Sequence, residues 1–222
     1  MAKKQSSLIN MALTLFVITG LASMALGFVY YFTKEDIANV EANKLNKALG
    51  EVLPQFDHQN ADTVKGEALD LKFDPIVYTA FDSNNQRVGA AVKTQSDGFG
   101  GKIELLVGFD NDGKIFGYSV LKHSETAGLG SKMDKWFQAD GKGNVIGKDM
   151  ANGELKVRKD KGDVDAITAA TISSRAFCVA LNNAYKVFVS MDSNASTEVE
   201  QPTATEQPAA AVENNDGGNS NE

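Results

Sequence analysis

One long apolar segment stands out near the N-terminus. An uncharged stretch runs from Ile9 to Phe32 and ends in three consecutive aromatic residues. About 24 residues at helical rise span roughly 36 Å, which is enough to cross a bilayer with some tilt. The small residues around Ala25 also suit a signal-peptide cleavage site, but the apolar run continues past them, which favours an uncleaved anchor. We predict a transmembrane helix over residues 9–32.

The charges that flank this segment bear on its orientation. Lys3 and Lys4 lie in a short tail, residues 1–8, that carries no acid, and such tails stay in the cytoplasm. Lysines also follow the segment, so a count of charges does not decide alone, but long domains translocate largely regardless of flanking charge. We expect a single-pass protein of the inner membrane with a cytoplasmic N-terminus and a periplasmic domain.

A helical pattern follows the span and then fades. Thr33 is a plausible N-cap, and apolar residues from Ile37 to Val52 recur at helical spacing until Pro54 ends the pattern. Residues 55–75 show no clear periodicity. We therefore predict a helical and irregular connector over 33–75.

Short runs rich in β-branched and aromatic residues, separated by turn residues, predict strands. The expected strands are 76–81, 87–94, 102–109, 114–121 and 154–158, with a hairpin turn at 111–113. A short helix is expected over 132–138, and a clear apolar stripe predicts a long helix over 172–191. The pattern indicates an α+β fold: an antiparallel sheet with packed helices, in a domain over residues 76–191.

The acidic balance of the chain is confined to its C-terminal end. The chain has 29 acids and 22 bases, and no Lys or Arg follows Lys186, whereas seven acids lie beyond Met191. Residues 192–222 also lack the apolar side chains that would offset the entropy of ordering, so we predict a disordered acidic tail. The remaining residues form no basic cluster, which argues against a nucleic-acid partner.

Few residues suit metal binding or acid–base chemistry. Cys178 is the single cysteine, and His58 and His123 are the two histidines, too few for a zinc site. Asp110–Gly113 resembles the start of a calcium loop, but the twelfth position is Leu121 instead of a glutamate. We expect no metal ligand and no catalytic residue in this chain.

The segment Asp165-Ala166-Ile167-Thr168-Ala169-Ala170-Thr171 resembles the flavinylation motif of the FMN-binding domain family. That motif is Asp, two variable residues, Ser or Thr, usually Gly, then Ala and Thr or Ser. In the family, a flavin transferase takes FMN from FAD and esterifies its phosphate to the last hydroxyl. The resemblance implies that Thr171 is the acceptor, that Asp165 and Thr168 are recognition positions, and that Ala170 matches the motif's Ala, whereas Ala169 replaces the usual Gly.

The predicted helix over 172–191 begins directly after Thr171, so a phosphoester there would lie at a helix N-terminus, which favours anions. The alternative is that Thr168 or Thr171 only caps this helix.

A second segment is similar to a loop of the same family. Residues 125–130 read Glu-Thr-Ala-Gly-Leu-Gly, where the family has Glu-Thr-Pro-Gly-Leu-Gly. In the family the backbone of this loop approaches the flavin, and glycines permit such an approach because they have no Cβ. The resemblance implies that the flavin is bound by Glu125, Thr126, Gly128, Leu129 and Gly130.

One N-terminal span followed by one flavin domain resembles the G subunits of Rnf-type ion-translocating ferredoxin:NAD oxidoreductases. The resemblance implies an electron-transfer subunit of a translocase that carries covalent FMN. Its expected partners are the other subunits of the redox complex, a flavin transferase during maturation, and membrane lipid. Two alternatives stay open: the related C subunit of a sodium-pumping NADH:quinone reductase, and an anchored binding or scaffold module without a cofactor.

Overall fold

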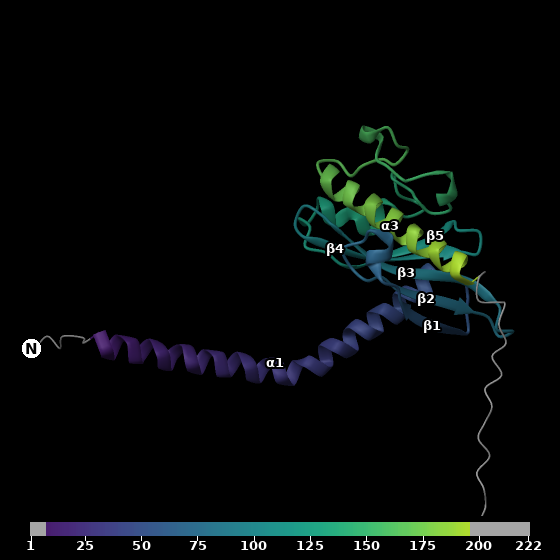
Figure 1. The fold of residues 1–222 in the computed structure, drawn as a ribbon. Coiled ribbons are helices and arrows are strands. Elements are labelled where there is room, and N and C mark those ends of the chain that lie inside the picture. Colours follow the sequence, from purple (N-terminus) through teal and green to yellow (C-terminus); the bar gives the residue numbers. More distant parts are fainter. Residues whose placement is uncertain (1–7, 196–222) are drawn as a thin grey trace, which may run out of the picture.

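The structure, a computed structural model, describes residues 8–195. A long helix leads into a domain in which one sheet is packed against helices and loops (Figure 1). This arrangement confirms the predicted α+β fold with an N-terminal apolar helix. The predicted cytoplasmic tail, apart from Leu8, and the predicted acidic tail beyond Ala195 lie outside the described residues.

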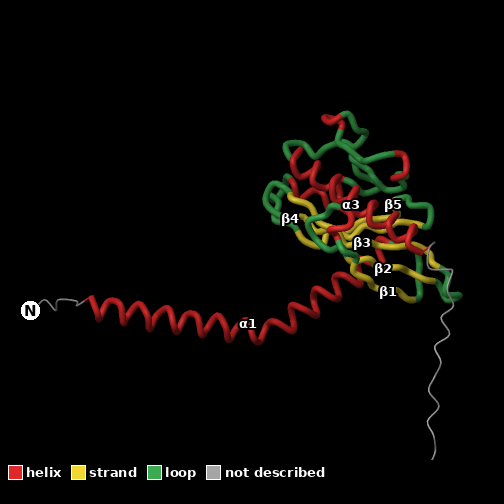
Figure 2. Tube along the Cα trace, viewed as in Figure 1, coloured by secondary structure: helices red, strands yellow, loops and turns green. Residues whose placement is uncertain are grey.

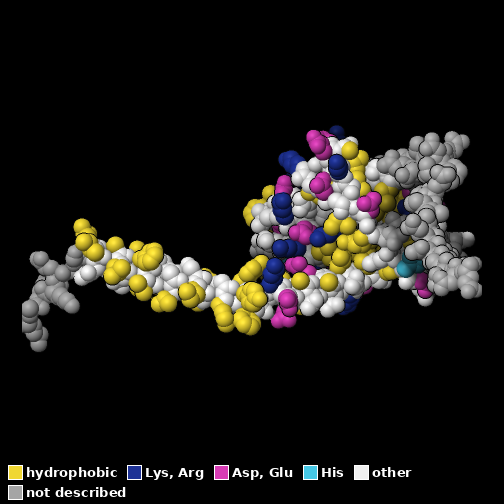
Figure 3. Space-filling view, turned by 60° about the horizontal axis from the view of Figure 1, so that its bottom comes forward, with side chains coloured by type: hydrophobic (Ala, Val, Ile, Leu, Met, Phe, Trp, Pro, Cys, Tyr) yellow, Lys and Arg dark blue, Asp and Glu magenta, His cyan; other side chains and the backbone are white. Residues whose placement is uncertain are grey.

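Helix α1 (Leu8–Val52) is continuous through the expected boundary at Thr33. The prediction that Thr33 caps a separate helix was wrong, because its hydroxyl donates to the carbonyl of Val29 at 2.9 Å, one turn back in the same helix. Figure 1 shows that α1 extends away from the domain and bends about midway. Within residues 8–195, α1 is the one helix that is long and apolar enough to cross a membrane. Apolar side chains cover its N-terminal half, and charged side chains gather where it meets the domain (Figure 3).

Five strands form one antiparallel sheet in which each strand pairs with the next along the chain (Figure 2). The strands are β1 (His58–Thr63), β2 (Ile76–Phe81), β3 (Arg87–Asp97), β4 (Lys102–Asp110) and β5 (Ile115–Lys122). The four strands predicted between residues 76 and 121 are confirmed, with ends that differ by up to three residues.

Strand β1 lies in the segment that was expected to be irregular, so that expectation was wrong. Its six residues are polar or small and mostly exposed, which leaves no alternation of apolar side chains for a sequence to display. The strand exists because its backbone pairs with β2, where Ala61 faces Tyr78.

The expected strand over 154–158 is absent. Val157 forms only an isolated parallel bridge with Val164, and the 3-10 turn η4 (Arg158–Asp160) follows directly. Both valines are buried in the core, so the apolar pattern reported burial of a loop. The helix expected over 132–138 is reduced to α2 (Met133–Trp136), preceded by η2 (Gly130–Lys132). Further 3-10 turns are η1 (Gly66–Leu69) and η3 (Met150–Asn152).

Both faces of the sheet are covered. Helix α3 (Thr171–Ala195) packs on one face, where Leu105 and Phe109 of β4 meet Phe177 and its neighbours in one apolar cluster. The end of α1 packs on the other face, where Leu106 joins Leu49 in a second cluster. Because alternate side chains of a strand point to opposite faces, burial on both sides explains why β4 is apolar almost throughout.

Two glycines let α1 lie directly on the strands. Gly108 of β4 and Gly117 of β5 face each other in register. A Cβ atom on Gly108 would lie 1.8 Å from the carbonyl oxygen of Val52, the last residue of α1. The Lys44 ammonium also donates to the carbonyl of Leu121. These contacts fix the domain to the helix that carries the apolar segment.

Candidate cofactor site

A cavity of about 390 Å³ lies at the N-terminus of α3. Three segments build its wall: the β3–β4 turn, the loop that starts at Glu125, and the first residues of α3. The lining residues are Phe99, Glu125, Thr126, Leu129, Gly130, Ala169, Ala170, Thr171, Ile172 and Ser173. Its volume is within the range of roughly 300–1,000 Å³ that is typical of sites for small molecules. The fold therefore brings parts of both motif segments to one cavity.

A tight turn precedes α3. The amide of Ala170 donates to the carbonyl of Ile167 at 3.0 Å, with Thr168 and Ala169 at the centre of the turn. Ala169 has a φ of +62°, in the left-handed region that favours glycine, so the backbone gives a reason for glycine at this position of the motif. The Ser174 hydroxyl accepts from the amide of Ile167 at 2.9 Å and donates to the carbonyl of Ala170 at 2.9 Å, which ties the turn to α3.

Thr171 is the first residue of α3, and its side chain is partly exposed in the cavity wall. The first helical bond runs from the amide of Ser174 to the carbonyl of Ala170 at 3.0 Å, so Ala170 takes the N-cap position. Neither Thr168 nor Thr171 stands at that position, which disfavours the alternative that they only cap the helix. The amides of the first turn have no partner inside the helix and suit an anion.

The carboxylate of Glu125 holds the cavity wall together. Its side chain is buried, and one carboxylate oxygen accepts from the amide of Gly100 at 3.0 Å. The other oxygen accepts from the hydroxyl of Ser173 at 2.5 Å. Buried carboxylates need such partners, because an unpaired one is costly to remove from water. Glu125 therefore connects the β3–β4 turn with α3.

The two glycines of the 125–130 loop have different surroundings. A Cβ atom on Gly130 would lie 2.6 Å from a carboxylate oxygen of Glu125, so close packing requires a glycine there. Gly128 has a φ of +75° and open space around it, and its amide donates to the hydroxyl of Ser131 at 2.9 Å. Gly128 is exposed and outside the cavity wall. The geometry therefore gives Gly128 a conformational role, whereas Gly130 packs against the wall.

Asp165 and Thr168 also lie outside the cavity wall. The Asp165 carboxylate pairs with Arg158 at 2.7 Å, and its carbonyl accepts from the indole of Trp136 at 2.8 Å. Asp165 thus braces the turn from behind, and Thr168 presents an exposed side chain at the tip of the turn.

Sequence reasoning missed four residues around the cavity: Phe99, Lys159, Ile172 and Ser173. Phe99 is 69% exposed and Ile172 is 51% exposed, although both side chains are large and apolar. Lys159 donates to the hydroxyl of Thr171 at 3.2 Å. In the sequence, the signal for Phe99 was an aromatic residue between glycines, whereas Lys159 and Ser173 resemble ordinary surface and helix residues.

The residues present fit a flavin mononucleotide. Apolar side chains of Phe99, Leu129 and Ile172 can cover the faces of a flat ring, while the first amides of α3 and the Lys159 ammonium can neutralise a phosphate beside Thr171. Both kinds of surface occur in one cavity.

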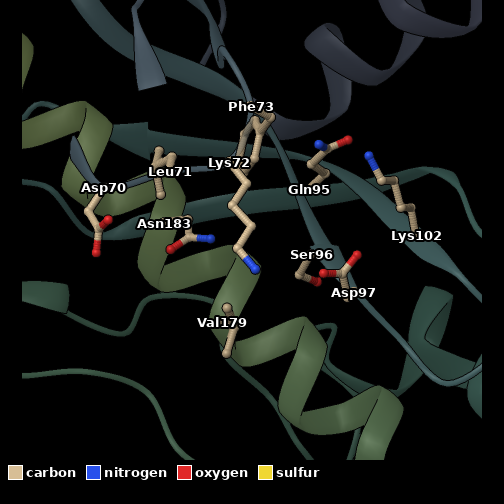
Figure 4. Close-up of a pocket in the computed structure, with 10 residues that line it drawn as sticks. All are labelled: Asp70, Leu71, Lys72, Phe73, Gln95, Ser96, Asp97, Lys102, Val179 and Asn183. Carbon is tan, nitrogen blue, oxygen red and sulfur yellow. The ribbon is translucent and has the colours of Figure 1, made fainter. Parts of the chain in front are cut away.

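A second cavity, of about 370 Å³, lies between η1, the β3–β4 end of the sheet and α3. Figure 4 shows the Lys72 side chain extending across it toward α3. Charges of both signs are mixed on its wall, which includes Asp70, Asp97 and Lys102. It contains no residue of either motif segment, so it is not the candidate flavin site.

Comparisons with known proteins agree with this geometry. The FMN-binding domain family matches residues 98–186. The G subunit of an ion-translocating oxidoreductase complex from Aliivibrio fischeri is 37% identical over 195 residues, covering 82% of this chain and 88% of the relative. The G subunit of such a complex from Methanosarcina acetivorans is 34% identical over 174 residues, covering 77% and 89%.

Among solved structures, the C chain of the sodium-translocating NADH-quinone reductase from Parabacteroides distasonis aligns with a TM-score of 0.46 and 20% identity, covering 66% of this chain and 81% of that one. The extent and identity of the matches to the curated relatives decide the assignment: the chain belongs to the family of G subunits of ion-translocating oxidoreductase complexes.

Proposed function

We propose that this chain is the electron-transfer subunit of an Rnf-type complex and carries FMN esterified to Thr171. The observation that carries the proposal is the shared cavity: the hydroxyl of Thr171 and the loop from Glu125 to Gly130 line the same wall. The curated relatives are named as G subunits, which favours this assignment over the quinone-reductase alternative.

Bound FMN would supply one- and two-electron transfer. The residues of the chain bind and orient it. Phe99 and Ile172 flank the ring site, Glu125 keeps the two sides of the wall at a fixed distance, and the start of α3 receives the phosphate. Because Phe99 and Ile172 are largely exposed, a redox partner can approach the ring from solvent.

Attachment requires one group transfer. The hydroxyl oxygen of Thr171 forms a bond to the phosphorus on the flavin side of FAD, and the pyrophosphate P–O bond breaks. AMP leaves with the bridging oxygen, and the hydroxyl proton passes to the transferase or to solvent. No electron is gained or lost in this step. A covalent tether retains the cofactor in a compartment where a lost flavin is not readily replaced.

The proposed topology follows from α1. Its apolar part crosses the inner membrane with the N-terminus in the cytoplasm, so the flavin domain lies in the periplasm beside lipid and the other subunits. If the span is an uncleaved anchor, the N-terminal peptide will remain with the protein in membrane fractions. A soluble protein that starts at Leu26 would contradict this topology.

Mass spectrometry tests the attachment. The parent chain, expressed in cells that contain the flavin transferase, should carry one FMN minus water on the tryptic peptide that contains Thr171. Thr171→Ala should lose the modification, and Thr171→Ser should keep it, because serine supplies the same hydroxyl. An unmodified parent peptide would contradict the proposal.

A further inference from the structure

We propose that Lys159 is a positioning residue for flavin attachment, which orients the Thr171 hydroxyl before transfer and pairs with the phosphate of the finished ester. The inference rests on the proposed function and adds a residue that belongs to neither motif segment. It concerns the chain's own recognition of a flavin phosphate.

The contact is direct and comes from a braced loop. The Lys159 ammonium lies 3.2 Å from the hydroxyl oxygen of Thr171. Lys159 is in η4, whose flanks are tied together: the amide of Arg158 donates to the carbonyl of Val164 at 2.9 Å, and Val157 is buried in the core. The backbone that carries Lys159 is therefore fixed beside the start of α3, although the lysine side chain itself is exposed.

The neighbouring charges leave this ammonium available. Three acids lie between Lys159 and the motif turn, and each is held by another base. Asp160 pairs with Arg175 at 2.7 Å, Asp163 pairs with Lys148, and Asp165 pairs with Arg158 at 2.7 Å. The hydrogen bonds from Arg175 and Lys148 lower the pKa values of Asp160 and Asp163, so these carboxyls stay ionised and keep their partners. Among the described side chains, the contact found for Lys159 is the acceptor hydroxyl.

The chemistry suits both stages of attachment. An ammonium has three donors and no acceptor, so Lys159 donates to one lone pair of the Thr171 oxygen and does not act as the base. The second lone pair is left to attack phosphorus. After transfer, the oxygen belongs to a phosphodiester with one negative charge, which the ammonium and the first amides of α3 stabilise together.

Transfer kinetics provide the first test. The full chain in detergent is incubated with FAD and the flavin transferase, and the modified fraction is followed by mass spectrometry. Lys159→Met should slow attachment on the order of tenfold, the size of effect expected for one charge-assisted hydrogen bond. Lys159→Arg should stay close to the parent because it keeps the charge.

Lys161→Met is the matched control, because it removes one positive charge from the same loop. Equal rates for Lys159→Met and Lys161→Met would overturn the inference, whether both are slow or both are fast. If the parent itself is not modified, the proposed function fails with it; a modified parent with an unaffected Lys159→Met variant removes only the inference.

A second measurement separates pairing with phosphate from recognition by the transferase. Samples of the parent, Lys159→Met and Lys161→Met are all taken to complete modification, and the phosphorus resonance of the ester is recorded by NMR. The inference predicts a shifted resonance in Lys159→Met alone. A slow reaction with an unchanged resonance would mean that the transferase reads Lys159 directly, and the proposed pairing would be wrong.

Discussion

The carboxylate of Glu125 accepts a hydrogen bond of 2.5 Å from the hydroxyl of Ser173, 48 residues later in the chain. The other carboxylate oxygen holds the amide of Gly100 at 3.0 Å. One buried side chain thus connects the loop that follows β5, the β3–β4 turn and the first turn of α3. The distance between the walls of the flavin cavity depends on this carboxylate.

Glu125→Gln should therefore weaken the domain. The amide oxygen can still accept from Gly100, but the charge-assisted bond with Ser173 is lost, which is worth about 1.5–3 kcal/mol in the free energy of unfolding. Urea denaturation in the Thr171→Ala background measures this without a contribution from bound cofactor. Glu104→Gln is the control, because Glu104 pairs with Lys93 at 3.7 Å near the surface, where a pair is worth less than about 1 kcal/mol. Equal losses in the two variants would show that Glu125 has no special role.

Substitutions at the two loop glycines should separate cofactor environment from stability. Gly130→Ala puts a Cβ atom 2.6 Å from the Glu125 carboxylate, so the wall must move and the flavin spectrum and potential should change. Gly128→Ala meets no atom within 4 Å but strains a backbone with a φ of +75°, so it should cost about 1 kcal/mol of stability. Its flavin spectrum should match the parent. Potentiometric titration and thermal melting of both variants check this, and a changed potential in Gly128→Ala would place that residue at the ring after all.

The sequence predicted the central strands and α3 because their apolar side chains follow regular periods. Strand β1 was missed because it is held by backbone pairing with β2, which leaves no trace in side-chain pattern. The strand expected at 154–158 failed for the opposite reason, since Val157 is buried without being in a sheet. In the site, the motif segments were visible as short strings. Lys159 was not, because its meaning lies only in the fold that puts it beside Thr171.

Ala169→Gly should stabilise the turn before α3. Ala169 has a φ of +62°, and the left-handed conformation costs a residue with a Cβ roughly 1–2 kcal/mol relative to glycine. Part of that gain is lost because glycine makes the unfolded chain more flexible, so we expect a net gain of up to about 1 kcal/mol. Ala166→Gly is the control, because Ala166 is not in the left-handed region and glycine there should only destabilise. Chemical denaturation of both variants measures the difference, and a destabilised Ala169→Gly would argue against the strained turn.

Cys178 should be unreactive in the folded protein. Burial raises the pKa of its thiol from an ordinary value of 9.0 to about 12, so little thiolate forms at pH 8 and alkylation should be slow until the protein unfolds. The unfolded thiol loses its proton near pH 9, whereas the folded one keeps it until about pH 12. The stabilising contribution is therefore complete below pH 9 and is lost as pH rises toward 12. Melting curves of the parent and Cys178→Ala should diverge only in that range, and rapid alkylation of the native protein at pH 8 would contradict the burial.

The last prediction concerns the attachment of α1 to the sheet. Gly108→Ala would place a Cβ atom 1.8 Å from the carbonyl oxygen of Val52, so the end of α1 must shift away from β4. Overpacking of this kind costs about 1–3 kcal/mol. Gly50→Ala is the matched control in α1 itself: its Cβ meets nothing within 4 Å, and alanine favours a helix over glycine by about 1 kcal/mol, so this variant should be more stable than the parent.

Urea denaturation followed by the fluorescence of Trp136, the single tryptophan, should give changes of opposite sign for the two variants. Limited proteolysis near Glu51 should also cut Gly108→Ala faster than the parent, because the last turn of α1 loses its contact with β4 and β5 and opens more often. Since α1 is also the candidate membrane span, this contact fixes how the flavin domain is held relative to the membrane. If Gly108→Ala were as stable as Gly50→Ala and equally resistant to protease, the helix would not be seated on the glycine pair, and the domain would be free to change its orientation on the anchor.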